Sequence, residues 1–246
     1  MNFYAIGPLA YLNEICGVGY PFHMCLAQYL YDKDYMPTDY FMYYRRRASM
    51  HTYKVILDNG AYEDASVNSD LLLRAATELN PDVLILPDSI NNMGATLTKG
   101  EAFKMLLKRQ AWRGKTMTVV QAERGNTEQW VHSYMEACKQ SPWVGIPRNQ
   151  QSGLTRACFM QLLKERKVYN TQTIHHALGM VNGDFGEMQD LNDTGLVKGI
   201  DSSNPIWRGL TGGAAAHGDF NPYACNDSLY IDQAGTRFRE ALAACK

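Results

Sequence analysis

Short apolar runs recur along this chain, and stretches with helical periodicity separate them. The sequence predicts strands at 3–6, 55–57, 83–86, 116–120, 143–146, 173–178 and 196–200, and helices at 67–79, 100–110, 127–138, 154–166 and 183–192. Continuous apolar strands that alternate with helices are typical of a parallel sheet covered on its faces. Seven such units, with room for an eighth, predict an α/β fold with a single (β/α)₈ TIM-type barrel domain over residues 1–246. A doubly wound open sheet is the alternative.

Residues 17–51 fit this pattern least. They contain many tyrosines, Pro21, Pro37 and three consecutive arginines. We expect an insertion or a substrate-facing segment there, and a closing helix at 233–244.

The charge of the chain limits what it can bind. The net charge is −1, which excludes a globally basic nucleic-acid binder. A local basic stripe remains, because Arg45, Arg46 and Arg47 follow two tyrosines, a composition suited to phosphate contact. The alternative for this stripe is a solvated loop.

No metal or cofactor is predicted. The six cysteines lie far apart, and none forms a CxxC pair or a zinc-like spacing, so reduced and mostly buried thiols are expected. The N-terminus lacks the pattern of a secretory signal. The sequence contains no run of about 18 apolar residues, so no membrane span is expected. We therefore expect a cytoplasmic protein.

Polar residues follow four of the predicted strands, directly or after one proline. They are Asp58, Asp88, Gln121 and Asp201. In a barrel of this kind the active site lies at the carboxyl ends of the strands. One such residue is an ordinary turn or cap residue. Four at one rim predict a site, because grouped carboxylates repel unless substrate or protons offset them.

The residues at these strand ends resemble the tRNA-guanine transglycosylases, a family of TIM barrels. Asp58-Asn59-Gly60-Ala61-Tyr62 is similar to the family's Asp-Ser-Gly-Gly-(Tyr/Phe) motif. The other matching segments follow in the family's order: Leu86-Pro87-Asp88, Val119-Val120-Gln121-Ala122, Trp143-Val144-Gly145-Ile146, His175-His176-Ala177-Leu178-Gly179 and Gly199-Ile200-Asp201. The resemblance covers residues 55–205 in scattered short motifs.

The chain departs from that family in two ways. The family's zinc site of closely spaced cysteines has no counterpart, and the chain is shorter and lacks the region that helps to dock tRNA. The resemblance therefore favours the branch that inserts 7-deazaguanine bases into DNA, as in phages and some bacterial gene clusters. It implies DNA and a free 7-deazaguanine base (preQ0-like) as partners, in the host cytoplasm if the protein is viral. A tRNA substrate remains possible, and the oligomeric state is open.

The resemblance also implies a role for individual residues. Asp201 would be the nucleophile and Asp58 the general acid and base of a base-exchanging glycosyltransferase, a pentosyltransferase. The base-binding residues would be Asp88, Gln121, the backbone of Gly145, Asn59, and Tyr62 and Leu178 as the sandwich around the ring. Arg45, Arg46, Arg47 and Arg208 would contact the nucleic acid. His175 and His176 are expected in the core or in supporting positions.

Two other functions stay open from the sequence. An N-glycosidase acting on nucleosides or nucleotides would use the same architecture with water as acceptor. A non-catalytic nucleic-acid-binding barrel is the other, although three carboxylates at one rim would repel a phosphate backbone.

Overall fold

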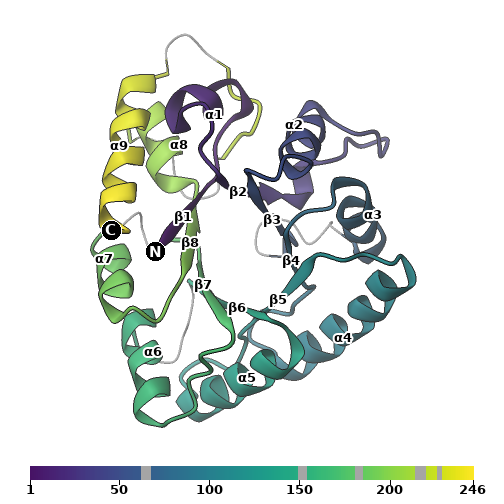
Figure 1. The fold of residues 1–246 in the computed structure, drawn as a ribbon, viewed down its shortest axis with the longest axis vertical. Helices are drawn as coiled ribbons and strands as arrows, with labels where there is room; N and C mark the ends of the chain where they lie inside the picture. The colour runs from purple at the N-terminus through teal and green to yellow at the C-terminus, as the bar shows by residue number, and fades with distance from the viewer. Residues whose placement is uncertain (62–67, 149–153, 181–184, 214–219, 226–228) are drawn as a thin grey trace.

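The computed structural model is a closed barrel of eight parallel strands in chain order, surrounded by helices (Figure 1). Its strands are β1 (Asn2–Ala5), β2 (Phe22–Leu26), β3 (Lys54–Asp58), β4 (Val83–Ile85), β5 (Lys115–Val119), β6 (Trp143–Pro147), β7 (Ile174–Leu178) and β8 (Gly199–Ser202). The barrel closes where β1 pairs with β8, with Asn2 opposite Gly199. The predicted (β/α)₈ barrel is confirmed, and the open sheet is excluded. The structure describes residues 1–61, 68–148, 154–180, 185–213, 220–225 and 229–246.

Helices form the outer layer of the barrel (Figure 1). They are α1 (Leu9–Cys16), α2 (Asp39–Ala48), α3 (Ser69–Leu79), α4 (Met93–Arg109), α5 (Thr127–Gln140), α6 (Arg156–Glu165), α7 (Phe185–Thr194), α8 (Asn204–Leu210) and α9 (Ile231–Ala244). Helix α4 begins seven residues before the predicted start at 100, because the Asn92 side chain caps it by accepting a hydrogen bond from the Ala95 amide. None of the helices in the described ranges is long and apolar enough to cross a membrane.

The segment 17–51 is a regular strand and helix, so its interpretation as an insertion is wrong. Strand β2 supplies the missing eighth strand and pairs with β3 along its whole length. A short 3₁₀ turn, Ala27–Tyr29, and the Thr38-capped helix α2 follow. Pro21 directly precedes β2, where its missing N–H costs the sheet little. The three arginines lie in the last turn of α2, not in a loop.

Side chains along each strand point alternately into the barrel and out toward the helices, so one apolar core lies inside the barrel and another lies between the strands and the helices. Inward side chains fill the barrel with large residues such as Tyr4, Met24, Ile56 and Met117. Outward side chains pack under the helices in two further clusters. Because successive strand residues point to opposite faces, the inward set leads directly to the side chains at the barrel mouth.

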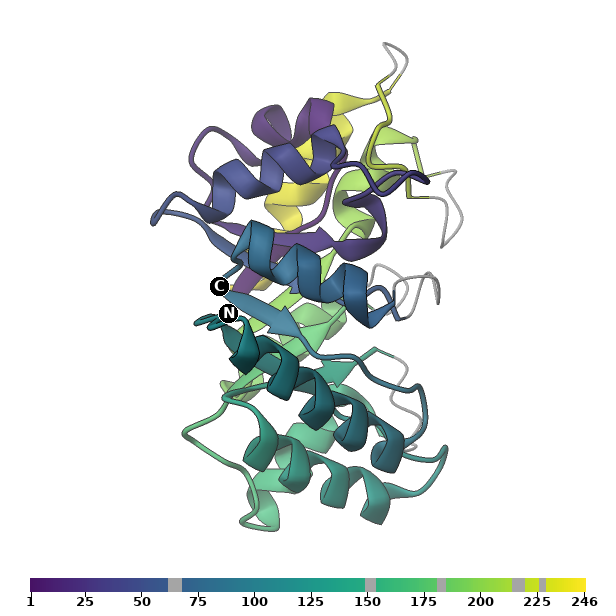
Figure 2. The same cartoon turned by 90° about the vertical axis from the view of Figure 1, so that its right-hand side faces the viewer.

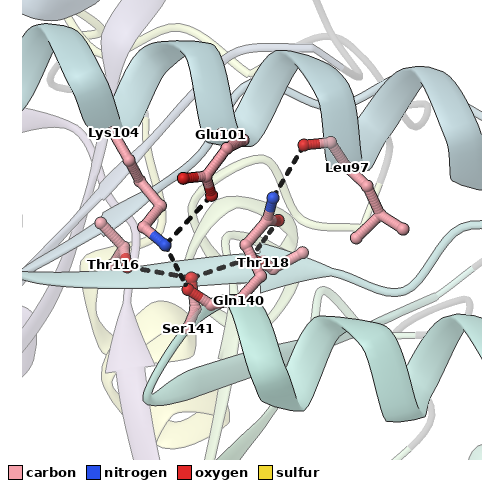
Figure 3. Close-up of polar contacts among 7 residues, drawn as sticks. All are labelled: Leu97, Glu101, Lys104, Thr116, Thr118, Gln140 and Ser141. Atoms are coloured by element: carbon pink, nitrogen blue, oxygen red, sulfur yellow. Dashed lines mark hydrogen bonds and ion pairs between the residues drawn. The ribbon is translucent and has the colours of Figure 1, made fainter.

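A partly buried polar network fixes β5 from outside the barrel (Figure 3). Thr118 Oγ1 lies 2.9 Å from Gln140 Oε1 and 2.8 Å from Ser141 Oγ. Gln140 donates to the Leu97 carbonyl of α4 at 2.7 Å, and its own carbonyl accepts from Lys104 at 2.8 Å. These bonds join β5 to the neighbouring helices α4 and α5, and so hold the strand that leads to Gln121.

All six cysteines are free thiols. Cys25 and Cys245 are buried, whereas Cys158 and Cys225 are exposed.

Candidate active site

A cavity of about 170 Å³ lies at the carboxyl ends of the strands. The four polar residues that the sequence predicted at one rim, Asp58, Asp88, Gln121 and Asp201, all line it. Its apolar walls come from strand ends and from loops, and include Met24, Ile85, Ile90, Leu178, Met180, Trp207 and Phe220. An apolar cavity with a few convergent polar groups is the usual form of a small-molecule site.

Asp58 ends β3 and points into the barrel mouth, on the same strand face as Ile56. Its Oδ2 accepts a hydrogen bond from the Gly60 amide at 3.0 Å. Gly60 has a φ of 70°, a conformation that favours glycine. Asp58 is therefore a turn residue and a cavity residue at once, and its half-buried carboxylate faces the cavity.

Two side-chain amides hold Asp88. Asn59 Nδ2 donates to Asp88 Oδ1 at 2.8 Å, and Gln121 Nε2 donates to Oδ2 at 2.6 Å. Asn59 also donates to the Leu86 carbonyl at 2.7 Å, and Gln121 Oε1 accepts from the Asn91 amide at 3.0 Å. Both amides are thus oriented by backbone groups. Each oxygen of Asp88 keeps a second lone pair for a ligand donor.

Burial raises the pKa of the Asp88 carboxyl, and the hydrogen bonds from Asn59 and Gln121 oppose that shift. Asp88 and Gln121, both predicted as base-binding residues, contact each other, because one N–H of Gln121 is already used on Asp88.

Asp201 is buried at the other side of the mouth, with 5% of its surface exposed. His176 Nε2 lies 2.9 Å from its Oδ1, and the Gly179 amide donates to its Oδ2 at 3.2 Å. Because a carboxylate accepts, Nε2 carries the proton. In the described part of the chain the other ring nitrogen, Nδ1, has no hydrogen-bond partner, which fits this tautomer.

The sequence of β8 makes room for His176. This ring is fully buried and packs edge-on against Tyr4, with ring centroids 5.1 Å apart. Gly199 lies opposite His176 in the sheet, and a Cβ there would stand 2.5 Å from His176 Nδ1. A side chain at residue 199 would therefore push the imidazole away from Asp201.

The neighbouring His175 points outward and belongs to the helical layer. It stacks on Tyr169 with centroids 4.7 Å apart, and its Nε2 lies 2.8 Å from the Tyr134 hydroxyl. Burial lowers its pKa to about 4. The two adjacent histidines thus have different surroundings, and only His176 contacts the cavity carboxylates.

A buried arginine holds the turn after β7. Arg156 donates to the carbonyls of Leu178 and Gly179, each at 2.8 Å, and pairs with Glu187 at 2.7 Å. The Gly179 amide in turn meets Asp201. Nothing in the sequence distinguishes Arg156 from the surface arginines, since its burial depends on how α6 packs.

The other residues predicted to contact substrate differ in where they lie. Leu178 lines the cavity, but Gly145 does not, because the Leu178 side chain fills the space in front of it, 2.8 Å from where a Cβ would be. Tyr62 lies outside the described residues. Arg208 lines a second, adjacent cavity.

The arginine run, which the sequence predicted as a nucleic-acid contact, lies at the opposite end of the barrel from this cavity. Helix α2 follows β2 and runs back to the start of β3. Figure 2 shows the C-terminal end of α2 on the side of the barrel where the two chain termini lie. The Arg47 guanidinium lies over the Tyr43 and Tyr53 rings, at 4.9 and 4.4 Å, and donates to the Tyr53 hydroxyl and to Asn13. Arg45 and Arg46 are exposed to solvent.

Within the described ranges, no group of three His, Cys, Asp or Glu side chains is arranged to hold a metal ion. The chain matches no protein-family model and no curated protein.

Proposed function

We propose that this protein is a guanine transglycosylase that exchanges guanine in DNA for a 7-deazaguanine base through a covalent aspartyl–sugar intermediate. The observation that supports this most is the arrangement of three carboxylates around one apolar cavity. Asp201 is held by a buried imidazole and a backbone amide, Asp88 by two side-chain amides, and Asp58 is half-buried beside them.

The chemistry needs two of these carboxylates. The Asp201 carboxylate attacks C1′ of the sugar from the face opposite the base, and the bond from C1′ to N9 of guanine breaks. Asp58 gives a proton to the leaving base. In the second half, N9 of the incoming base attacks C1′ and displaces Asp201, while Asp58 accepts the proton from that base. Two displacements preserve the configuration, as in retaining glycosidases.

The third carboxylate suits recognition of the base. An ionised Asp88 only accepts hydrogen bonds, and guanine and 7-deazaguanine both present N1–H and an exocyclic amine as adjacent donors. Adenine has neither an N1–H nor a 2-amino group to donate to Asp88 and is disfavoured for that reason. Leu178 and Met180 supply apolar contact for the ring.

The choice of DNA rests on the wide spacing of the cysteines in residues 1–246, which forms no zinc-like cluster. A duplex would have to present its guanine out of the stack, at a cost of about a few kcal/mol.

The test offers labelled guanine and labelled 7-deazaguanine base to genomic DNA and to total tRNA in parallel, at one salt concentration. We expect label in DNA, and none with the Asp201→Asn variant. Incorporation into tRNA alone would contradict the DNA substrate. Base release without incorporation would instead indicate an N-glycosidase, and no reaction with any acceptor would contradict the enzyme proposal.

A further inference from the structure

A second cavity of about 220 Å³ lies next to the first, among α7, α8 and α9. Asn204 lines both cavities. Arg208, Gln233 and Arg237 add three further polar side chains, and Gly212 and Gly213 also line this cavity. Asn204 and Arg208 are four residues apart on α8, so they share one face of that helix.

The packing of α8 on α9 brings the two arginines to the same cavity. Gly209 lies against the backbone of α9, where a Cβ would stand 2.4 Å from the Ala234 Cα. Only a glycine allows this close approach. Arg208 precedes that contact on α8, and Arg237 follows it on α9 by one turn.

Two of the residues that line this cavity, Arg208 and Arg237, are cationic, and none of the lining residues in the described ranges is acidic. Within the described part of the chain, the Arg208 guanidinium has no ion-pair or hydrogen-bond partner. Arg237 pairs with Glu240 at 3.0 Å, but the two side chains are 56% and 45% exposed. Such exposed pairs are weak, so Arg237 can exchange this partner for a ligand.

We propose that this second cavity binds a phosphate group. Guanidinium groups match phosphate oxygens with paired hydrogen bonds, and the amides of Asn204 and Gln233 are additional donors. Glycine residues at the wall allow a phosphate to approach the backbone. Because Asn204 lies between the cavities, the phosphate belongs beside a sugar whose base occupies the first cavity. That last step rests on the proposed function, whereas anion binding itself does not.

The phosphate can come from a free nucleotide or from a nucleic-acid backbone, and binding measurements separate the two. We expect dGMP to bind wild-type protein about tenfold or more tightly than deoxyguanosine does, in line with charge-assisted hydrogen bonds. Arg208→Ala should remove this advantage without changing deoxyguanosine affinity, and Arg208→Lys should restore part of it. Arg239→Ala is the matched control, because it removes one exposed charge from α9 outside the cavity.

Two further arms complete the test. Inorganic phosphate alone should raise the melting temperature of wild-type protein and of Arg239→Ala, but not of Arg208→Ala; this result supports the anion site even if no nucleoside binds and the proposed function fails. The second arm measures the binding of a short single-stranded oligonucleotide at several salt concentrations. If a nucleic-acid backbone supplies the phosphate, the slope of log K against log salt concentration should be smaller by about one in Arg208→Ala than in wild type. An unchanged slope with a lost dGMP advantage assigns the site to free nucleotides. The proposal would be overturned if the affinity for dGMP and the affinity for phosphate were each the same in wild type, in Arg208→Ala and in the Arg208→Ala/Arg237→Ala double variant.

Discussion

The two sides of the cavity hold their carboxylates in different ways. On the side of β3, β4 and β5, Asp88 lies beyond the end of its strand, and the side chains of Asn59 and Gln121 hold it. On the side of β7 and β8, Asp201 lies within its strand and is held by a buried ring and a backbone amide. The first arrangement depends on side chains at neighbouring strand ends, and the second on the register of the barrel itself.

Under the proposed function, this difference separates the residue that recognises the base from the residue that reacts with the sugar. A carboxylate braced by amides keeps lone pairs directed at a ligand and is suited to reading hydrogen-bond donors. A carboxylate fixed within a strand keeps one position while the sugar moves toward it, which suits a nucleophile. We therefore expect substitutions on the two sides of the cavity to have different consequences.

The largest effect is expected at Asp201. Asp201→Asn should lower the exchange rate by about 10⁵- to 10⁶-fold, the size found when a catalytic nucleophile is removed. Asp58→Asn should cost about 10²- to 10⁴-fold, the usual contribution of a general acid or base. Steady-state rates with labelled base compare the two variants, and a larger loss in Asp58→Asn would reverse the assignment.

The next largest effect is expected from a substitution that disturbs the contact between His176 and Asp201 without removing a polar side chain. Gly199→Ala should displace His176 from Asp201 and lower kcat by about 10²-fold, as small misplacements of reacting groups do. Gly94→Ala on α4 is the matched control, since the nearest atom to a Cβ there is 3.8 Å away. If kcat is unchanged in a folded Gly199→Ala protein, the buried imidazole does not position the nucleophile.

A pH profile tests the support of Asp88. Asp88 must be ionised to accept from the base, and burial raises its pKa, so the acid limb of kcat/KM should lie above the usual range for an aspartate. Asn59→Ala removes one hydrogen-bond donor to the ionised Asp88 carboxylate. This should shift the acid limb of the kcat/KM profile to a higher pH by about one unit. Activity would then be lost at a higher pH than in wild type. Asn126→Ala, which removes only the cap of α5, should leave the limb in place, and a limb that does not move in Asn59→Ala would refute the role of that amide.

The smallest effect is expected at the other end of the barrel. Arg45→Ala/Arg46→Ala should change nucleic-acid affinity by less than about twofold, since exposed charges more than about a Debye length away are largely screened. Salt-dependent binding of an oligonucleotide measures this directly. A loss as large as that of Arg208→Ala would mean that substrate reaches the α2 end of the molecule.

The strand-end residues could be predicted because a parallel barrel collects whatever follows its strands at one rim. Asp58, Asp88, Gln121 and Asp201 each follow an apolar run, and the cavity brings all four together. The partners of these residues could not be read from the sequence. The contact between His176 and Asp201 depends on the register of β7 against β8, and the burial of Arg156 depends on how α6 packs.

Helix α2, which carries the arginine run, was not predicted although local signals were present. Thr38 is a helix cap, Asp39 lies in the first turn, and the three arginines lie in the last turn, which is the charge order that a helix dipole favours. Strand β2 was missed for another reason. Its five residues follow Pro21 and two glycines, so the run resembles loop sequence until the register with β3 is known.

The most direct test of the central claim is the identity of the residue that becomes attached to the sugar. The protein is incubated with a guanine-containing oligonucleotide, denatured rapidly and digested, and the adduct is located by mass spectrometry of the peptides. We expect the sugar on the peptide that contains Asp201, with the adduct still formed by Asp58→Asn and absent from Asp201→Asn. An adduct on any other residue, or one that persists in Asp201→Asn, would contradict the account.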